Sequence, residues 1–237
     1  MYRRLIKNNV YKFYFFIKKL NYFIFDFFYF QKSYSLEGED LLINGLLEFK
    51  KNGFYVDIGA YHPVKFSNTN LFYKNGWQGI NIDAMPGSMR VFNLKRRRDI
   101  NLEIPISDCP LTLIYYIFDS GAYNTFSKEL AEKNIVNSCL LKKVELKTQT
   151  LASILGQYVP DNQQIDFFSI DVEGYDLNVL KSNDWEKYKP RFILVEDHDF
   201  SLEMPTTSQI YNYLSSQGYK LVTKTKSTVI YQIDKFF

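Results

Sequence analysis

Short apolar segments alternate with amphipathic segments from residue 37 to the end of the chain. Several apolar segments carry no polar face, which is typical of strands buried on both sides in a parallel sheet. The amphipathic segments repeat apolar residues at helical spacing. The pattern predicts strands at 54–60, 79–84, 100–107, 111–118, 144–150, 165–172, 191–197, 219–225 and 228–234, and helices at 37–51, 70–75, 88–98, 127–134, 175–185 and 207–217.

This alternation predicts an α/β domain, with a mostly parallel sheet covered by helices on both faces. Segments 219–225 and 228–234 are expected to close the sheet as an antiparallel pair. The chain has 237 residues, which suits one such domain with a substantial core. Three arginines at 96–98 end a predicted helix, where basic side chains favour the helix dipole, and we expect them to be solvated.

The first 36 residues differ in composition from the rest. They hold seven Lys or Arg and one acid, a net charge of +6, against −3 for the remainder. We therefore predict two parts, a basic aromatic helical segment at 1–36 and a catalytic domain at 37–237. The aromatic residues of 1–35 can pack on the chain's own domain or on a second copy in a homo-oligomer. They can also bind an anionic membrane surface, or the segment can be disordered.

Nucleic acid is not an expected partner, because the whole-chain charge is only +3 and the aromatic clusters look buried rather than splayed. The apolar run at 20–30 contains Asp26 and is too short to cross a bilayer. No small residues follow it as a cleavage site would require. Cys109 and Cys139 fit free thiols in a reducing compartment. We expect a cytoplasmic protein, with the inner face of the membrane as a second location.

Acidic residues follow four of the predicted strands, at the edge where open α/β sheets bind ligands. Asp57 and Gly59 follow the first, without the further glycines of a dinucleotide fingerprint. Asp83 ends the second, where an acid can accept hydrogen bonds from ribose hydroxyls. The third strand is followed by Ser107 and Asp108, whose carboxylate can accept from an adenine amino group.

The fourth group combines two strand ends that should be neighbours. Asp171 and Glu173 follow one strand, and Glu196 and Asp197 end the next, with His198 beside them. Adjoining carboxylates repel one another unless they share protons or a cation. Such a group therefore indicates a divalent metal held by oxygen ligands, a general base, or both.

Taken together, these residues resemble the FkbM family of methyltransferases. The carrying segments are FYVDIGAYHP (54–63), GINIDAMPGSM (79–89), TLASIL (150–155), IDFFSIDVEGYDLNVL (165–180) and RFILVED (191–197). The resemblance implies the Rossmann-like class I methyltransferase fold, with a mostly parallel seven-stranded sheet. It also implies S-adenosylmethionine as cofactor, and a sugar hydroxyl as acceptor in surface polysaccharide or glycan biosynthesis.

The resemblance places the cofactor along the strand ends, with Asp83 on the ribose and Asp108 on the adenine. The full expected cofactor-binding set is Asp57, Gly59, Ala60, Tyr61, Asp83, Ala84, Ser107, Asp108 and Asp171. Two positions depart from the family pattern. Family members more often carry Glu-Pro where Asp83 stands, and many carry Asn and Gly where this chain has His62 and Pro63.

The acid groups are also similar to those of metal-dependent sugar O-methyltransferases of the TylF type. That similarity implies Asp171, Glu196 and Asp197 as ligands of Mg²⁺ or another divalent cation. It implies Glu173 as the base, with His198 as the alternative proton acceptor, so the expected catalytic residues are Glu173, His198 and Asp171.

The sequence thus predicts an S-adenosylmethionine-dependent O-methyltransferase that acts on a nucleotide sugar, a lipid-linked glycan or a polysaccharide. Two alternatives share parts of the pattern. One is an NAD(P)-dependent sugar oxidoreductase, which also begins with a βαβ unit and a ribose-binding acid. The other is a non-catalytic cofactor-binding scaffold that docks on a membrane through residues 1–35.

Overall fold

The computed structural model describes residues 11–22 and 31–234. The chain divides into two compact units, Met1–Ser33 and Tyr34–Phe237. In the first, residues 11–22 are helical. Among the described residues, no helix has the length and apolar character needed to cross a bilayer. The predicted domain boundary after residue 36 stays a prediction.

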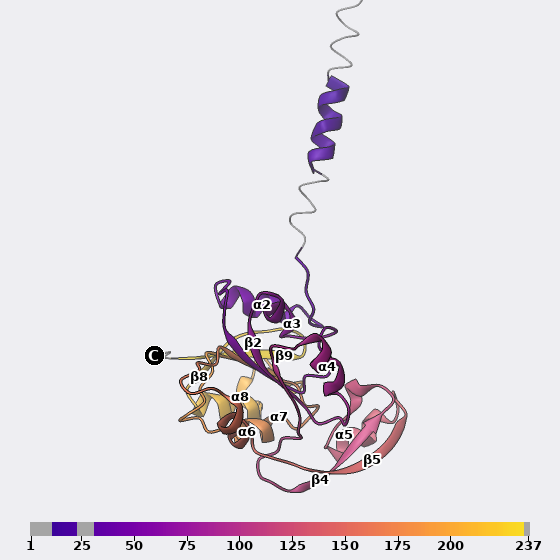
Figure 1. Ribbon diagram of the computed structural model, residues 1–237, viewed down its shortest axis with the longest axis vertical. Coiled ribbons are helices and arrows are strands. Elements are labelled where there is room, and N and C mark those ends of the chain that lie inside the picture. The colour runs from indigo at the N-terminus through magenta and orange to yellow at the C-terminus, as the bar shows by residue number, and fades with distance from the viewer. Residues whose placement is uncertain (1–10, 23–30, 235–237) are drawn as a thin grey trace, which may run out of the picture. The chain divides into compact units, whose positions relative to one another are not determined.

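The second unit is built on a seven-stranded sheet with the order β3-β2-β1-β6-β7-β9-β8 (Figure 1). Neighbouring strands from β3 to β7 are parallel, whereas β9 runs antiparallel to both β7 and β8. The strands are β1 (Phe54–Ile58), β2 (Gln78–Asp83), β3 (Ile100–Glu103), β6 (Phe167–Ile170), β7 (Phe192–Glu196), β8 (Tyr219–Lys224) and β9 (Thr228–Ile233). The predicted mostly parallel, Rossmann-like sheet with a C-terminal antiparallel pair is confirmed.

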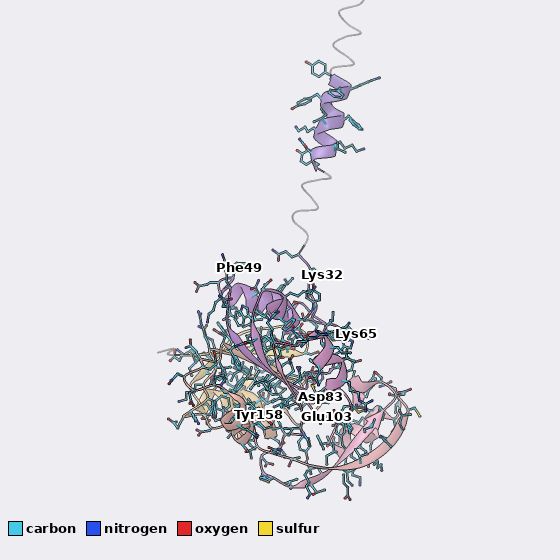
Figure 2. The ribbon with its side chains drawn as sticks, in the orientation of Figure 1. Lys32, Phe49, Lys65, Asp83, Glu103 and Tyr158 are labelled. Carbon is cyan, nitrogen blue, oxygen red and sulfur yellow. The ribbon has the colours of Figure 1, made fainter. Side chains whose placement is uncertain are left out.

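Helices pack on both faces of this sheet, as predicted, because alternate strand residues point to opposite sides. One core joins Val56 and Phe168 to α6, α7 and α8, and the other joins Tyr55 and Phe167 to α2 and α3. Figure 2 shows the side chains that surround the sheet. The helices are α2 (Glu39–Leu46), α3 (Asn70–Lys74), α4 (Met89–Lys95), α6 (Leu151–Tyr158), α7 (Asp176–Lys181) and α8 (Gln209–Ser216), with a 3₁₀ turn η2 (Pro205–Thr207) before α8.

The segment between β3 and α6 forms a separate substructure. Here β4 (Thr112–Phe118) and β5 (Leu140–Lys147) pair with each other as a separate two-stranded antiparallel ribbon. Between them lie the 3₁₀ turn η1 (Gly121–Tyr123) and α5 (Lys128–Asn134). We call residues 112–147 the cap. Figure 1 shows the cap beside α4.

Side-chain caps begin several helices where the sequence offers Ser or Thr. Ser127 accepts a hydrogen bond from the backbone N–H of Leu130 at the start of α5. Thr150 does the same for α6, and Ser208 for α8. A hydroxyl at this position satisfies one of the free N–H groups of the first turn, so these residues fix where the helices begin.

Candidate functional site

A cavity of about 570 Å³ opens at the carboxyl ends of the parallel strands, under the cap. Its size lies within the range of small-molecule binding sites. Strand register explains which residues meet there. Ile58 pairs with Ile82 on one side and with Ile170 on the other, and Ile170 pairs with Val195. The residues that follow, Asp83, Gly59, Asp171 and Glu196, therefore form one row along the cavity.

Gly59 stands at the point where β1 and β6 come closest. Its φ of 80° lies in the left-handed region, and a Cβ there would come within 1.7 Å of the Asp171 carbonyl oxygen. No other residue fits this position without a backbone shift. The glycine therefore keeps the Asp171 strand end beside the floor of the cavity.

Asp83 lies at one end of the row, with both carboxylate oxygens held by backbone groups. Oδ2 accepts from the N–H of Tyr61 at 2.9 Å, and Oδ1 accepts from the N–H of Met85 at 2.7 Å. Burial nevertheless raises the pKa of Asp83. Of the predicted cofactor-binding set, the cavity is lined by Gly59, Tyr61, Asp83, Ala84 and Asp171.

The other four predicted cofactor residues do not line the cavity. Ala60 packs on Met89 and Phe92 of α4. Ser107 is buried and donates to Asp108, and that bond lowers the pKa of the exposed Asp108 carboxyl. The wall near the third strand is instead formed by two apolar side chains, Ile104 and Ile106.

Asp57 points away from the cavity because it shares the α3 face of β1 with Tyr55, two residues before it. There its Oδ2 accepts from the hydroxyl of Thr69 at 2.7 Å. Thr69 in turn accepts from the guanidinium of Arg96 at 2.6 Å. Burial raises the pKa of Asp57 to about 6, while Thr69 and Arg96 oppose that rise.

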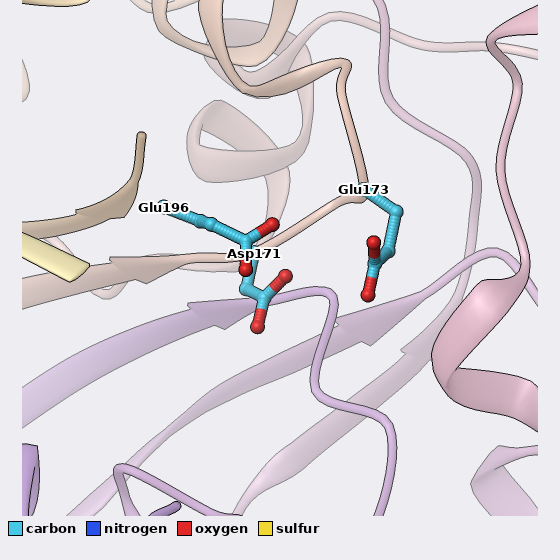
Figure 3. Close-up of side chains that lie close together, drawn as sticks. All are labelled: Asp171, Glu173 and Glu196. Atoms are coloured by element: carbon cyan, nitrogen blue, oxygen red, sulfur yellow. The ribbon is translucent and has the colours of Figure 1, made fainter. Parts of the chain in front are cut away.

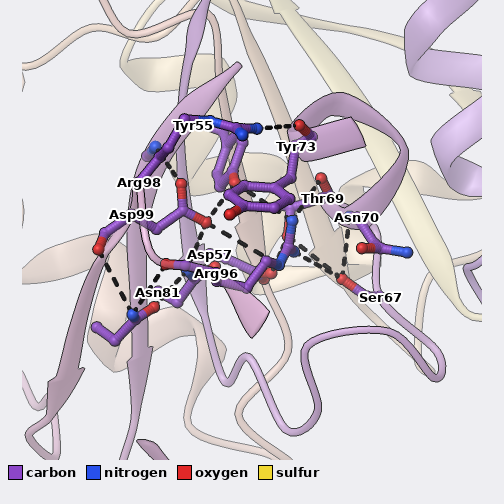
Figure 4. A network of polar contacts seen from close by, with 12 residues as sticks. Tyr55, Asp57, Ser67, Thr69, Asn70, Tyr73, Asn81, Arg96, Arg98 and Asp99 are labelled. Atoms are coloured by element: carbon purple, nitrogen blue, oxygen red, sulfur yellow. Dashed lines mark hydrogen bonds and ion pairs between the residues drawn. The ribbon is translucent and has the colours of Figure 1, made fainter. Parts of the chain in front are cut away.

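The prediction that all three arginines at 96–98 are solvated is wrong for Arg96. Arg97 and Arg98 are exposed, but Arg96 is fully buried among polar side chains (Figure 4). Its guanidinium lies near the hydroxyl of Tyr55, the carboxylate of Asp99 and the hydroxyls of Ser67 and Thr69. The sequence carried no signal for this, because periodicity does not distinguish one arginine of three.

Three carboxylates converge at the other end of the row. Asp171, Glu173 and Glu196 each offer an oxygen within 4.8 Å of the others (Figure 3). Among the described residues, this is the group able to hold a metal ion. Asp197, predicted as a ligand, is absent from it because consecutive strand residues face opposite sides. Its Oδ2 instead accepts at 2.5 Å from the hydroxyl of Ser208, and Glu173 takes its place.

The acid cluster, meaning Asp171, Glu173 and Glu196, strongly disfavours full ionisation. Burial, with added repulsion from Asp171 and Asp176, raises the pKa of Glu173 to about 8. Burial and neighbouring carboxylates also raise the pKa values of Asp171 and Glu196, which hydrogen-bond to each other. At neutral pH this cluster holds protons, and a bound cation would displace them.

Two residues that sequence reasoning missed shape the loop that carries Glu173. Asp176 accepts from the N–H groups of Val172 at 3.1 Å and Gly174 at 3.2 Å. The hydroxyl of Thr125, from the cap, donates to the carbonyl of Glu173 at 2.7 Å. Together they hold Glu173 at a φ of 52°. An Asp at the start of a helix after a Glu-Gly pair is a local signal that could have revealed Asp176.

The two histidines have different surroundings. His198 lies outside the cavity wall, with its side chain 66% exposed and Nε2 3.2 Å from Glu196. That position does not favour its predicted role as proton acceptor. His62 does line the cavity, and its Nδ1 accepts from the N–H groups of Val64 and Lys65. Burial and the charges of Lys95 and Lys65 lower its pKa, so the ring is neutral at pH 7.

The cap supplies the aromatic wall opposite the sheet. Tyr115 and Phe126 stack with ring centroids 4.5 Å apart, and Phe126 meets Tyr175 at 5.7 Å. All three line the cavity. Such apolar faces with a few carboxylates at one end are typical of sites that bind small polar molecules.

The fold and cavity define a Rossmann-like α/β protein with a ligand site at the strand ends. Residues 57–221 match the family described as the Methyltransferase FkbM domain. The chain therefore belongs to the FkbM methyltransferase family, and its membership implies S-adenosylmethionine as cofactor.

Among solved structures, a precorrin-6y C5,15-methyltransferase from Geobacter metallireducens GS-15 is similar, with a TM-score of 0.42. The two chains share 11% sequence identity, over 81% of this chain and 86% of that one. Comparison with curated proteins gives no match.

Proposed function

We propose that the protein transfers the methyl group of S-adenosylmethionine to a hydroxyl of a sugar in surface polysaccharide or glycan biosynthesis. The observation that carries this proposal is the acid cluster on the cavity wall beside Gly59. Several carboxylate oxygens in one place can accept hydrogen bonds from neighbouring hydroxyls of one sugar ring. Family membership leaves no reason to retain the NAD(P)-dependent oxidoreductase alternative.

The reaction needs a proton acceptor because a sugar hydroxyl has a pKa far above 7. When bound, S-adenosylmethionine would supply an electrophilic methyl carbon on a sulfonium; the acceptor oxygen would take that carbon, and the carbon–sulfur electron pair would stay on sulfur. The wall residues that would hold the cofactor are Gly59, Tyr61, Asp83 and Ala84. The hydroxyl proton passes to Glu173 in its ionised form, which lines the cavity at the end of the row. Because the pKa of Glu173 is about 8, a minor fraction is ionised at pH 7 and the fraction rises with pH. Thr125 and Asp176 hold that carboxylate's loop in place.

We further propose that a divalent cation such as Mg²⁺ binds the acid cluster. The donor set fits, because three hard oxygen donors lie within 4.8 Å of one another and desolvation and mutual repulsion raise the pKa of each. A cation there would lower the pKa of a bound hydroxyl and orient its neighbour. Asp171, Glu173 and Glu196 are the proposed ligands, in place of the predicted set with Asp197.

A thermal melt with and without millimolar MgCl₂ or MnCl₂ tests this on the chelator-treated protein. The cation should raise Tm of the wild type by several degrees, and Asp171→Asn should abolish the gain. Asp197→Asn is the matched control and should keep it. An equal response of wild type and Asp171→Asn would remove the metal from the proposal.

The methyl-transfer proposal is tested by mass spectrometry of glycans from cells with and without this chain. The presence of the chain should add 14 Da, the mass of one methylene, to one glycan component. Calorimetric titration should show binding of S-adenosylmethionine and none of NAD(P)H. An unchanged glycan profile together with cofactor binding would instead favour the non-catalytic scaffold.

We also propose that the N-terminal unit binds an anionic membrane surface, which would place the enzyme at the inner face of the cytoplasmic membrane. Helical spacing puts Phe13, Phe16, Ile17 and Leu20 on one face of residues 11–22, with lysines on the flanks. Apolar bulk flanked by basic residues is what interfacial helices use. The homo-oligomer alternative stays a prediction for the same surface.

Vesicle sedimentation with 30% phosphatidylserine tests the membrane proposal, using full-length protein. Binding should fall when salt rises, and when Lys12, Lys18 and Lys19 are all changed to Gln. A triple change to Gln at Lys142, Lys143 and Lys147, exposed lysines of the cap, is the control. Vesicle binding that is absent, or that responds equally to both triple changes, would count against the proposal.

A further inference from the structure

The charged side chains of the cavity wall are all acidic. Seven carboxylates line it, and no lysine or arginine does among the described residues. The acids are Glu37, Glu39, Asp83, Asp119, Asp171, Glu173 and Glu196. Lys65 and Lys95, whose charges act on His62, lie outside the wall.

Two of these acids reach the wall from the segment that begins α2. Glu37 and Glu39 contact Ser227 and Thr228, where β9 begins. Glu37 accepts from the N–H of Ser227 at 3.0 Å and from its hydroxyl at 3.1 Å. Glu39 accepts from the hydroxyl of Thr228, the residue that pairs with Glu196 across β7 and β9. The wall therefore adds Glu37 and Glu39 to the three carboxylates of the acid cluster, since Thr228 pairs with Glu196.

The structure keeps part of this charge ionised. Burial acts against ionisation of Glu37, but hydrogen bonds from Thr225 and Ser227 outweigh it and lower the pKa of that carboxyl. His62 is neutral and adds no positive charge. Hydrogen bonds from Ser138 and Cys139 likewise lower the pKa of Asp119. Protons or a cation are taken up by the acid cluster, and the sulfonium of the cofactor offsets one charge, so the wall keeps negative charge at Glu37 and Asp119.

We infer that the sugar unit that enters this cavity carries no phosphate, sulfate or carboxylate, and that an amine-bearing sugar binds more tightly than its uncharged counterpart. The inference rests on the proposed function and names the acceptor class for the same site. Proteins hold such anionic groups mainly with Arg and Lys, which this wall lacks, and a nearby carboxylate repels them.

The inference separates the acceptors that the sequence left open. A nucleotide sugar carries a diphosphate directly on the sugar that would be methylated. That group would have to enter or adjoin the carboxylate-lined end of the cavity. A sugar within a polysaccharide, or at the outer end of a lipid-linked glycan, brings no such charge and is the acceptor that we expect.

Saturation-transfer NMR on the full chain, loaded with S-adenosylhomocysteine, tests the charge preference with a matched panel of sugars. The panel is methyl glucosaminide, methyl glucoside, methyl glucuronide and glucose 6-phosphate, at pH 7 and with or without EDTA. The amine should bind at least about tenfold more tightly than either anion, with the uncharged glycoside between them. Half-molar salt should compress the series.

Glu37→Gln should narrow the gap between amine and anion, whereas Glu186→Gln, an exposed acid remote from the wall, should leave it unchanged. Binding that is independent of charge, tighter for an anion, or absent for all four sugars would overturn the inference. Calorimetry of S-adenosylmethionine on the same sample keeps the two proposals apart. Loss of cofactor binding would refute the function, while normal cofactor binding with no charge preference would refute only the acceptor class.

Discussion

Two groups of acids in the same domain have opposite surroundings: Asp57 and Asp99 are buried, whereas Asp171, Glu173 and Glu196 are open to the cavity. Asp57 and Asp99 lie on the α3 side of the sheet, where Arg96, Thr69, Tyr55 and other donors approach their carboxylates (Figure 4). Asp171, Glu173 and Glu196 lie at the strand ends, close together on one part of the cavity wall (Figure 3). The first group has its counter-charge built in, whereas the second depends on protons or a ligand.

This difference separates structural acids from functional ones better than their positions in the sequence do. A buried charge that is paired and hydrogen-bonded supports the fold, and removing its partner leaves an uncompensated ion. A cluster of like charges facing an open cavity costs stability, and such clusters occur where chemistry or binding uses them. Mutation should therefore lower the stability of the protein in the first group, and leave it unchanged or raise it in the second.

The largest expected effect is on catalysis, from the acid cluster. Asp171→Asn keeps the side-chain shape but removes one of the three charges. The rate of methyl transfer should fall about a thousandfold. The 14-Da glycan signal in complemented cells measures it. Affinity for S-adenosylmethionine should change little, and Tm should stay equal or rise because repulsion is relieved. A fall in Tm of several degrees would mean that Asp171 is structural like Asp57.

The next effect is on stability, from the other group. Arg96→Met leaves Asp99 buried without its cation and removes donors from Thr69 and Ser67. We expect the free energy of unfolding to fall by about 3–5 kcal/mol. Thermal melts should show Tm lowered by roughly 10 °C. Arg97→Met, at the neighbouring exposed position, is the control and should leave Tm unchanged. An unchanged Tm for Arg96→Met would show that the two groups of acids do not differ in their role in stability.

A smaller effect links the cap to the acid cluster. Thr125→Val removes the hydroxyl that donates to the Glu173 carbonyl and accepts from Ser127. We expect kcat to fall about tenfold with KM for the cofactor unchanged, because Glu173 loses its fixed position. Thr125→Ser keeps the hydroxyl and should restore most of the rate. An equal loss of activity in the Val and Ser variants would show that the hydroxyl of Thr125 does not account for its effect on the rate.

The smallest effect is the pH dependence of stability. Burial raises the pKa of Asp176 from 3.8 to about 7, with repulsion from Asp171 adding to it. A carboxyl whose pKa is raised by folding binds its proton more tightly in the folded state. Its contribution is therefore complete below about pH 4 and is lost as pH rises through 7.

Melts in EDTA should show Tm falling by a few degrees between pH 5 and 8. Asp176→Asn, which does not titrate, should flatten that part of the curve. A curve of unchanged slope in the variant would show that other groups set the pH dependence.

The sequence alone determined the order of strands and helices, because apolar runs and helical spacing are local patterns. It also indicated that Asp83, Gly59, Asp171, Glu173 and Glu196 follow strands and meet at one edge. That expectation depended on a general property of parallel sheets, namely that all carboxyl ends lie on the same side. The family resemblance added the methyltransferase activity that the match over residues 57–221 bears out.

Tertiary structure decided which of these residues face the cavity. Register and the alternation of strand faces turned Asp57 toward Arg96 and turned Asp197 toward Ser208. Contacts between distant segments brought Glu37 and Glu39 to Ser227 and Thr228 on the cavity wall, and Thr125 to the carbonyl of Glu173. Local sequence carries no record of such pairings, because they depend on how elements far apart in the chain pack together.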